Sequence, residues 1–340
     1  MTIQQAIKAV TAKQNLSSSQ MINVMQQIMT GQATQAQIGG FLVGLQMKGE
    51  TVTEIAAAAR VMRELATSVT LDCEPLIDTC GTGGDGASTF NVSTASAFVV
   101  AAAGGNVAKH GNRSISSSSG SADLLEAAGV NLDISATHIA QCVQSTGVGF
   151  MFAQKHHGAM KHAIGARKEL AVRTIFNLLG PLTNPANARH QVLGVYDRKW
   201  IEPMARVLKE LGSEHVLVVH AEDGLDEISI GSDSYIAELK NGEISCYTIK
   251  PEDFGLERQA VDQLAVADAK ESLAIIEAIF GRKAGPARDI VVLNAGAAIY
   301  AGDLTSTLME GIAKAQTVID NGAALQKMRD FIEITNTKDS

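Results

Sequence analysis

Residues 78–94 read Asp-Thr-Cys-Gly-Thr-Gly-Gly-Asp-Gly-Ala-Ser-Thr-Phe-Asn-Val-Ser-Thr. A short apolar, strand-like run leads into Asp78, four glycines follow at positions 81, 83, 84 and 86, and a helix-like run extends from 95 to 103. Glycine tolerates positive φ and lets the main chain approach a bulky anion closely. Free N–H groups in the turn and at the helix start supply donors and a favourable dipole. The stretch therefore predicts a phosphate-binding loop between a strand and a helix.

The loop differs from two common phosphate motifs. It lacks the Gly-Lys-Ser/Thr ending of a Walker loop, and Gly-x-Gly-x-x-Gly does not fall in register before the helix. A lone glycine-rich turn is as often structural as functional. Asp85 inside an anion loop is unfavourable unless a cation is also present, and a diphosphate carrying Mg²⁺ would explain glycines, hydroxyls and carboxylate together.

Two further segments carry polar side chains that suit the same ligand. Lys109 and Arg113 bring positive charge behind the first loop, and six serines occupy residues 114–121. Asp226 and Glu227 follow an apolar strand-like run and could cradle Mg²⁺. A serine linker and a solvated acidic loop are the alternatives, and the second would be favoured without the presumed diphosphate.

Hydrophobic periodicity predicts an α/β fold with two domains. Residues 1–69 show only helical spacing, and the remainder, 70–340, alternates strands and helices, which favours a mostly parallel central sheet. Residues 156–190 are helical and could pack on the helical domain. The expected helices of the first domain are 3–10, 19–29, 35–48 and 53–65. The expected strands are 76–79, 106–109, 148–152, 191–196, 216–220, 228–230, 235–239 and 243–249, and the last helices are 270–280, 287–300 and 304–331.

Composition excludes several classes of protein. The 340 residues are 46% apolar but only 4% aromatic, so a large aliphatic core is expected. A net charge of −8 argues against nucleic acid as the main partner. Four cysteines lack metal spacing and indicate a reducing cytoplasm. The longest apolar stretch, 97–104, is too short to cross a bilayer, and no signal peptide is recognisable.

Taken together, the motifs resemble the anthranilate phosphoribosyltransferase family of the tryptophan pathway. The most specific match is Arg-Thr-Ile-Phe-Asn-Leu-Leu-Gly-Pro-Leu-Thr-Asn-Pro at 173–185, and the similarity runs nearly end to end. The other matching stretches are 78–85, 91–94, 109–113, 120–123 and 224–229. The resemblance implies a phosphoribosyltransferase-like fold that dimerises through the helical domain. It also implies transfer of a phosphoribosyl group from phosphoribosyl diphosphate to the amine of anthranilate, the second step from chorismate, with Mg²⁺.

The resemblance also implies roles for individual residues. Ser93 and Glu227 would hold one Mg²⁺, and Asp226 with Glu227 a second. Lys109, His110, Asp226 and Glu227 are the candidate catalytic residues. Anthranilate would contact Gly81, Asn112 and Arg167. Phosphoribosyl diphosphate would contact Gly81, Gly84, Asp85, Thr89, Asn91, Val92, Ser93, Thr94, Lys109, His110, Gly111, Asn112, Arg113, Ser114, Ile115, Ser116, Ser117 and Ser121.

Some assignments stay open on residue types alone. Arg173 competes with Arg167 as the anchor of the anthranilate carboxylate. His110 either accepts the proton or hydrogen-bonds the carboxylate, or it only shapes the loop. The chain departs from the family at Ser118, where a basic residue is usual, and at Gln154, where proline is usual. Two alternative functions are a pyrimidine nucleoside phosphorylase, which would leave the acidic pair without a purpose, and a non-catalytic relative that binds nucleic acid.

Overall fold

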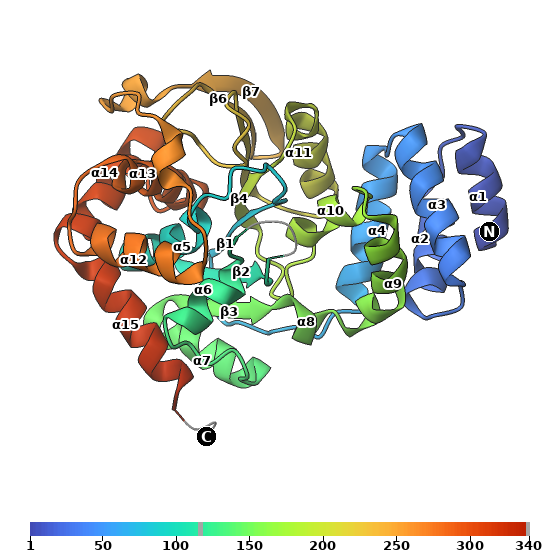
Figure 1. Cartoon of the computed structure of the whole chain (residues 1–340), viewed down its shortest axis with the longest axis horizontal. Helices are drawn as coiled ribbons and strands as arrows, with labels where there is room; N and C mark the ends of the chain where they lie inside the picture. The colour runs from blue at the N-terminus through green and yellow to red at the C-terminus, as the bar shows by residue number, and fades with distance from the viewer. Residues whose placement is uncertain (115–117, 338–340) are drawn as a thin grey trace.

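The first part of the chain is a bundle of four helices. The computed structural model describes residues 1–114 and 118–337, and the bundle lies at one end of the molecule (Figure 1). Each helix begins with a capping box, in which Thr2, Ser17, Thr34 or Thr51 accepts a main-chain N–H and a Gln or Glu side chain bonds back. The helices are α1 (Ile3–Thr11), α2 (Ser18–Met29), α3 (Gln35–Lys48) and α4 (Val52–Glu64).

A seven-stranded sheet forms the centre of the larger domain, in the order β3-β2-β1-β4-β5-β6-β7. Strands β1 to β5 are parallel, and β6 and β7 are antiparallel. The chain adds β2 and β3 on one side of β1 and then β4 on the other, so the order reverses between β1 and β4. Open α/β sheets bind ligands beyond the carboxyl ends of the strands at such a point. The strands are β1 (Leu76–Gly81), β2 (Asn106–Gly111), β3 (Val148–Phe152), β4 (His190–Gly194), β5 (His215–Ala221), β6 (Ser234–Lys240) and β7 (Glu243–Ile249).

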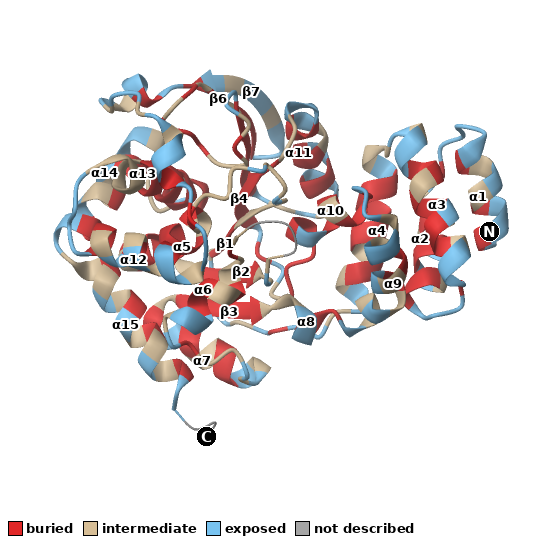
Figure 2. Cartoon of the chain, in the orientation of Figure 1, coloured by how far each residue is buried: buried red, intermediate tan, exposed pale blue. Residues whose placement is uncertain are grey.

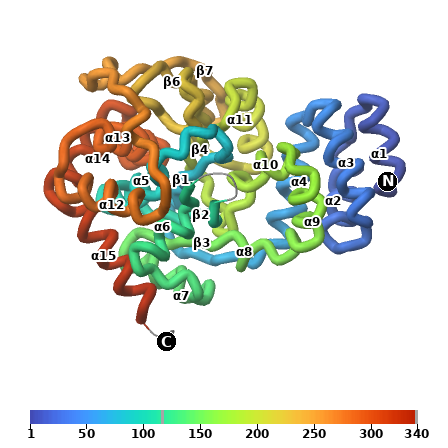
Figure 3. The backbone as a smooth tube through the Cα atoms, in the orientation of Figure 1, coloured from blue at the N-terminus to red at the C-terminus, as the bar shows by residue number. Residues whose placement is uncertain are grey.

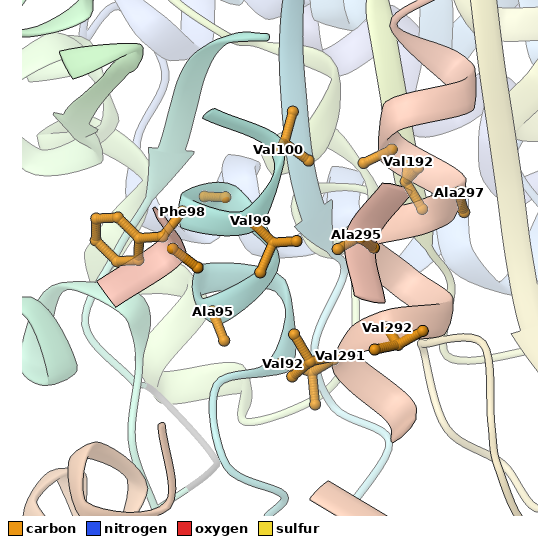
Figure 4. Close-up of a cluster of buried hydrophobic side chains, with 14 of the residues drawn as sticks. Val92, Ala95, Phe98, Val99, Val100, Val192, Val291, Val292, Ala295 and Ala297 are labelled. Carbon is orange, nitrogen blue, oxygen red and sulfur yellow. The ribbon is translucent and has the colours of Figure 1, made fainter. Parts of the chain in front are cut away.

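Both faces of the sheet are covered, as expected for parallel strands. Val192 and Leu217 point to the face covered by α5 (Val92–Ala102) and α13 (Pro286–Ala301). Figure 4 shows valines and alanines of these two helices side by side in that core. Leu193 and Val218 alternate to the other face, where they join the apolar cluster of α11 (Ile201–Glu210) and the helical bundle. Figure 2 shows buried positions running from the sheet through this interface.

The segment between β3 and β4 connects the two domains. Helix α9 (Lys161–Leu170) lies on the bundle (Figure 3), and Ala163 and Ala166 are buried in the same apolar cluster as α2 and α3. The Gln35 side chain bonds the main chain of α9 at Ala166 N, 2.8 Å. The phosphate-loop side of the sheet is therefore joined to the bundle by ordered helices.

The remaining helices are α6 (Ser121–Ala127), α7 (Ala136–Thr146), α8 (Ala153–His156), α10 (Phe176–Leu179), α12 (Ala269–Phe280), α14 (Leu308–Asp320) and α15 (Ala323–Thr335). Short 3-10 turns are η1 (Gly158–Met160), η2 (Gly180–Leu182), η3 (Arg198–Trp200), η4 (Pro251–Phe254) and η5 (Val261–Leu264). Among the described residues, no helix has the length and apolar character needed to cross a membrane.

Two expected elements are wrong. The single helix over 304–331 is two helices, because the chain turns at Asn321-Gly322 and Gly322 adopts a φ of +85° that favours glycine. The strand over 228–230 is an irregular loop, because Ile228 N–H bonds the Asn294 side chain and Ser229 N–H bonds the Ser234 hydroxyl. The overall fold class, a small helical domain and a larger α/β domain with a mostly parallel sheet, is confirmed.

The buried ion pair of Lys48 and Glu54 stabilises the bundle. The two charged atoms lie 2.8 Å apart, with side chains 2% and 0% exposed, and Glu54 also accepts the Leu16 N–H. Removing one partner of a buried pair leaves an uncompensated charge. We expect Glu54→Gln to lower the free energy of unfolding by about 3 kcal/mol in urea denaturation. Glu202→Gln, which breaks the exposed pair with Arg206, should cost less than about 1 kcal/mol; equal losses would contradict this assignment.

Candidate active site

The glycine loop folds around a carboxylate from a distant part of the chain. β1 ends at Gly81, and Gly83 and Gly84 follow with φ of +65° and +82°. The Gly83 N–H donates to Asp226 Oδ2 over 2.8 Å. The first and third of the three predicted segments therefore meet.

This contact depends on two residues without side chains. A Cβ on Gly81 would lie 2.3 Å from Asp226 Oδ2, and a Cβ on Gly194, at the end of β4, would lie 1.5 Å from the main-chain oxygen of Asp226. Any larger residue at either position would push the acidic loop away. Gly194 was not predicted, and only its position at the end of a strand beside β1 could have indicated it.

Negative charge accumulates where the loops meet. Burial raises the pKa of Asp226 to about 7, and the nearby Asp85 carboxylate adds to the shift. Burial also raises the pKa of Glu227 well above its ordinary value, with Asp226 as the next cause. Crowded carboxylates that resist ionisation suit a divalent cation, because Mg²⁺ prefers oxygen ligands and would compensate their charge.

A buried lysine lies beside this acidic cluster. Lys109 Nζ on β2 donates to the Thr79 carbonyl and lies 3.2 Å from Ser93 Oγ on α5. Burial lowers its pKa, and the Asp78 carboxylate opposes that shift. The lysine therefore fixes the end of β1 against the start of α5, and it places its charge on the inner side of the loop.

Asp78 joins the elements below Lys109. Its Oδ2 accepts from Asn184 Nδ2 over 2.7 Å, and its Oδ1 accepts the His110 N–H over 3.3 Å. Burial raises the pKa of Asp78. The Asn184 partner comes from the specific 173–185 motif, so that motif supports the phosphate loop from beneath.

The serine segment is held by acids of α6. Arg113 pairs with Asp123 and Glu126, so its charge is matched locally. Ser114 N–H and Gly120 N–H both donate to Asp123 Oδ2, at 2.9 and 3.0 Å. The predicted contacts Ile115, Ser116 and Ser117 lie outside the described residues.

The other residues predicted to contact phosphoribosyl diphosphate lie close in sequence to the ends of β1 and β2 or at the start of α6. Gly84, Asp85 and Thr89 follow β1, Gly111 ends β2, Asn112 follows it and Ser121 begins α6. Val92 and Thr94 are each only 1% exposed, and their N–H groups already donate to the Phe90 and Asn91 carbonyls, at 2.7 and 3.2 Å.

Asn91 is tied to a residue that sequence reasoning missed. Its Oδ1 accepts from Ser119 Oγ at 2.9 Å and from Ser272 Oγ at 2.8 Å. Ser272 lies in α12, among apolar and charged residues with no motif around it, so no sequence signal indicated this partner.

Two neutral histidines approach each other near the end of β2. The rings of His110 and His157 have centroids 5.0 Å apart. Burial lowers the pKa of His110 to about 3 and that of His157 to about 4. Within the described chain both Nε2 atoms are buried without a hydrogen-bond partner. Both rings therefore offer neutral polar atoms to a ligand. His156 instead hydrogen-bonds the Thr67 carbonyl at 2.7 Å.

The two candidate arginines have different surroundings. Arg173 donates to the Gly84 carbonyl and stacks on the Tyr196 ring at 4.0 Å. The Arg167 side chain lies over the Phe176 ring at 5.2 Å, and its guanidinium has no hydrogen bond or ion pair with residues 1–114 or 118–337. Burial lowers the pKa of Arg167. Arg167 is thus a desolvated cation with its donors available, whereas Arg173 is engaged in bracing the glycine loop.

A separate polar cluster lies at the amino ends of β4 and β5, where His190 and His215 begin the strands. His190, His215 and Asp303 are the one group of three potential metal ligands within 4.8 Å in the part of the chain that is described. His215 already bonds Asp303 at 2.7 Å and Glu238 at 3.1 Å, and Lys240 lies 3.8 Å from Asp303. The polar groups of this cluster therefore have partners within the protein.

Comparison with known proteins identifies the family. The model described as "Glycosyl transferase family, a/b domain" matches residues 73–325, and the one described as "Glycosyl transferase family, helical bundle domain" matches 4–66. The anthranilate phosphoribosyltransferase of Thioalkalivibrio sulfidiphilus is 61% identical over 98% of this chain and 99% of its own length. The chain belongs to the anthranilate phosphoribosyltransferase family.

Solved structures agree with this family assignment. The enzyme from Thermus thermophilus has a TM-score of 0.93 at 41% identity, covering 98% of this chain and 99% of its own. The Saccharomyces cerevisiae enzyme, solved in complex with PRPP and Mg, has a TM-score of 0.89 at 26% identity, covering 98% and 97%. The chain is therefore an enzyme of the glycosyltransferase class, and the family that its motifs resemble is confirmed.

The crowded acids predict that the site lowers stability at high pH. A carboxyl whose pKa rises from 3.8 to about 7 on folding keeps a proton that the unfolded chain releases. Stability is therefore lost as pH rises through that interval. We expect Asp226→Asn, which keeps an acceptor for Gly83 N–H, to raise the thermal midpoint at pH 8 without divalent metal and to leave it unchanged at pH 3.5.

The control is Asp72→Asn, which removes an exposed carboxylate that lies before β1 and outside the glycine loop. It should change the midpoint at neither pH. An Asp226→Asn variant that is less stable than the parent at pH 8 would contradict the proposed crowding of charge.

Proposed function

We propose that this enzyme transfers the 5-phosphoribosyl group from phosphoribosyl diphosphate to the amine of anthranilate. The products would be N-(5-phosphoribosyl)anthranilate and diphosphate, in the second step from chorismate to tryptophan. The observation that carries the proposal is the meeting of the glycine loop and the acidic pair at the strand-order reversal, where Gly83 N–H bonds Asp226. A nucleoside phosphorylase, which binds free phosphate, gives that acidic pair no role.

The acidic cluster fits Mg²⁺. Ser93, Asp226 and Glu227 would hold two ions, and the raised carboxyl pKa values of Asp226 and Glu227 support a cation there. Bound Mg²⁺ supplies Lewis-acid neutralisation of the negative charge on the departing diphosphate. The yeast relative solved with PRPP and Mg supports the same ligand pair for this chain.

The chain itself supplies the rest of the donor site. Main-chain N–H groups of the glycine loop would bind the diphosphate, since successive N–H groups in a turn form a concavity that favours anions. Lys109, held by Thr79 and Ser93, adds a fixed positive charge. Leaving-group charge is stabilised best by groups already in place before it develops.

The acceptor site would use Arg167, Asn112 and Gly81. Arg167 is a partly desolvated cation whose donors are available for the anthranilate carboxylate. The aryl amine is uncharged near neutral pH, so it needs orientation more than a strong base. The buried neutral His110 and His157, with unpartnered Nε2 atoms in the described structure, would orient the acceptor rather than carry charge.

We also infer a homodimer through the helical bundle and a cytoplasmic location. Met47 at the end of α3 and Ile164 on α9 are apolar yet 77% and 43% exposed. The resemblance to the family implies such a dimer, and these two side chains are candidates for its interface. A single monomer mass in sedimentation equilibrium would contradict the dimer.

The direct test of function follows anthranilate fluorescence with phosphoribosyl diphosphate and Mg²⁺. We expect the fluorescence to fall when the purified enzyme is added and to stay constant when the metal is chelated. The double variant Asp226→Asn/Glu227→Gln should keep the fold, judged by circular dichroism, and lose at least about a thousandfold of turnover, because charge stabilisation at the leaving group is removed. Near-normal turnover of that variant would refute the metal assignment.

Arg167 is expected to act on the acceptor alone. Removing a charge-assisted contact to the carboxylate should raise the anthranilate KM of Arg167→Ala about ten- to hundredfold and change the phosphoribosyl diphosphate KM less than about threefold. Steady-state kinetics with each substrate varied in turn will measure both values. Lys168→Ala, on the same helix and exposed, should change neither. An equal rise in both constants for Arg167→Ala would move the anchor to another residue.

A further inference from the structure

Asn91 has no free side-chain oxygen for a ligand, because two serines already bond it. Its Oδ1 accepts from Ser119 Oγ at 2.9 Å and from Ser272 Oγ at 2.8 Å. Its Nδ2 donates to the Ser119 carbonyl at 3.1 Å. The carboxamide therefore works as a cross-link inside the protein.

Ser272 uses its hydroxyl in both directions. It donates to Asn91 Oδ1 and accepts the Asn91 main-chain N–H at 3.0 Å. Its side chain is fully buried, with 0% exposed area. A buried hydroxyl that satisfies one donor and one acceptor of the same residue fixes both the main chain and the side chain of that residue.

Asn91 stands at the junction of the two loops that would bind the sugar donor. It precedes the first turn of α5, which contains Ser93, and through Ser119 it reaches the end of the serine segment before α6. The segment before α12 runs beside the same place, where Phe90 N–H bonds the Leu264 carbonyl and Val266 N–H bonds the Ser88 carbonyl, both at 2.9 Å. α12 thus braces the glycine loop from a part of the chain some 180 residues away.

We propose that Ser272 is a positioning residue for the sugar-donor site. Its hydroxyl fixes Asn91, and Asn91 holds the start of α5 in register with the end of the serine segment, so that both loops face the diphosphate together. The inference rests on the proposed function, since it assumes that these loops bind phosphoribosyl diphosphate. Arg167 on α9, the proposed anchor of the acceptor carboxylate, has none of these contacts among the described residues.

The test compares Ser272→Ala with the parent enzyme in steady-state kinetics and in calorimetric titration with phosphoribosyl diphosphate and Mg²⁺. Loss of two ordinary hydrogen bonds should raise the KM and the dissociation constant for the donor about tenfold. The anthranilate KM should change less than about twofold, because the loss is confined to the donor loops. If Ser272 only supported the fold, the substitution would change the KM values of both substrates or of neither.

Two comparisons separate Ser272 from a general effect of buried serines. Ser96→Ala removes a buried hydroxyl of α5 that has no partner in the described structure, and it should leave both KM values unchanged. Asn91→Ala should raise the donor KM, and adding Ser272→Ala to it should cause little further rise, because the serine acts through Asn91. An additive double variant would overturn the proposal.

If Ser272→Ala unfolds below the assay temperature, Ser119→Ala replaces it, since it removes the other donor to Asn91 Oδ1. The same donor-selective rise is expected. An unchanged donor KM in the folded variant overturns the inference while leaving the transferase activity intact. A parent enzyme that does not bind phosphoribosyl diphosphate would instead remove the proposed function, so the two failures are distinguishable.

Discussion

The loop that carries Asp226 can contact the ends of β1 and β4 only because Gly81 and Gly194 have no side chain. Cβ atoms there would lie 2.3 and 1.5 Å from atoms of Asp226. Contact between the glycine loop and Asp226 then follows through the Gly83 N–H. The parallel sheet brings these glycines together, because β1 and β4 pair in register with Gly81 opposite Gly194. The pairing of β1 with β4 therefore sets both the geometry of the site and the position of the Asp226 carboxyl group.

That constraint explains how a chain with net charge −8 can suit an anionic substrate. No broad basic surface would be required if main-chain N–H groups of the glycine loop and one buried lysine bind the ligand, as we propose. The pKa values of Asp226 and Glu227 are raised chiefly by burial, and then by repulsion from Asp85 at Asp226 and from Asp226 at Glu227. A site that crowds acidic groups together trades stability for function, as active sites commonly do.

The sequence predicted best those helices and strands whose ends are determined by residues nearby in the chain. The strands at 148–152 and 243–249 and the helix at 35–48 match the structure at both ends, because turn and capping residues mark them. The 304–331 helix failed because the apolar periodicity continues across Gly322, whose positive φ breaks the helix. The 228–230 strand failed because side chains of Asn294 and Ser234, remote or across a loop, take its N–H groups.

Site residues were predictable where they follow a strand in a motif. Asp226 and the glycine loop were found in this way, although their contact depends on strand order, which the sequence does not state. Ser272 was missed because its partner Asn91 is distant in the chain. Residue types could not separate Arg167 from Arg173, and only the structure shows that Arg173 already bonds the Gly84 carbonyl.

The most direct measurement is calorimetric titration of Gly81→Ala with phosphoribosyl diphosphate in the presence of Mg²⁺. The new Cβ would displace the Asp226 carboxylate without touching other main chain nearer than 3.6 Å. We expect a folded protein in which binding is lost, while Gly158→Ala, which has open space around it, binds as the parent does. Undiminished, Mg²⁺-dependent binding by Gly81→Ala would contradict the account.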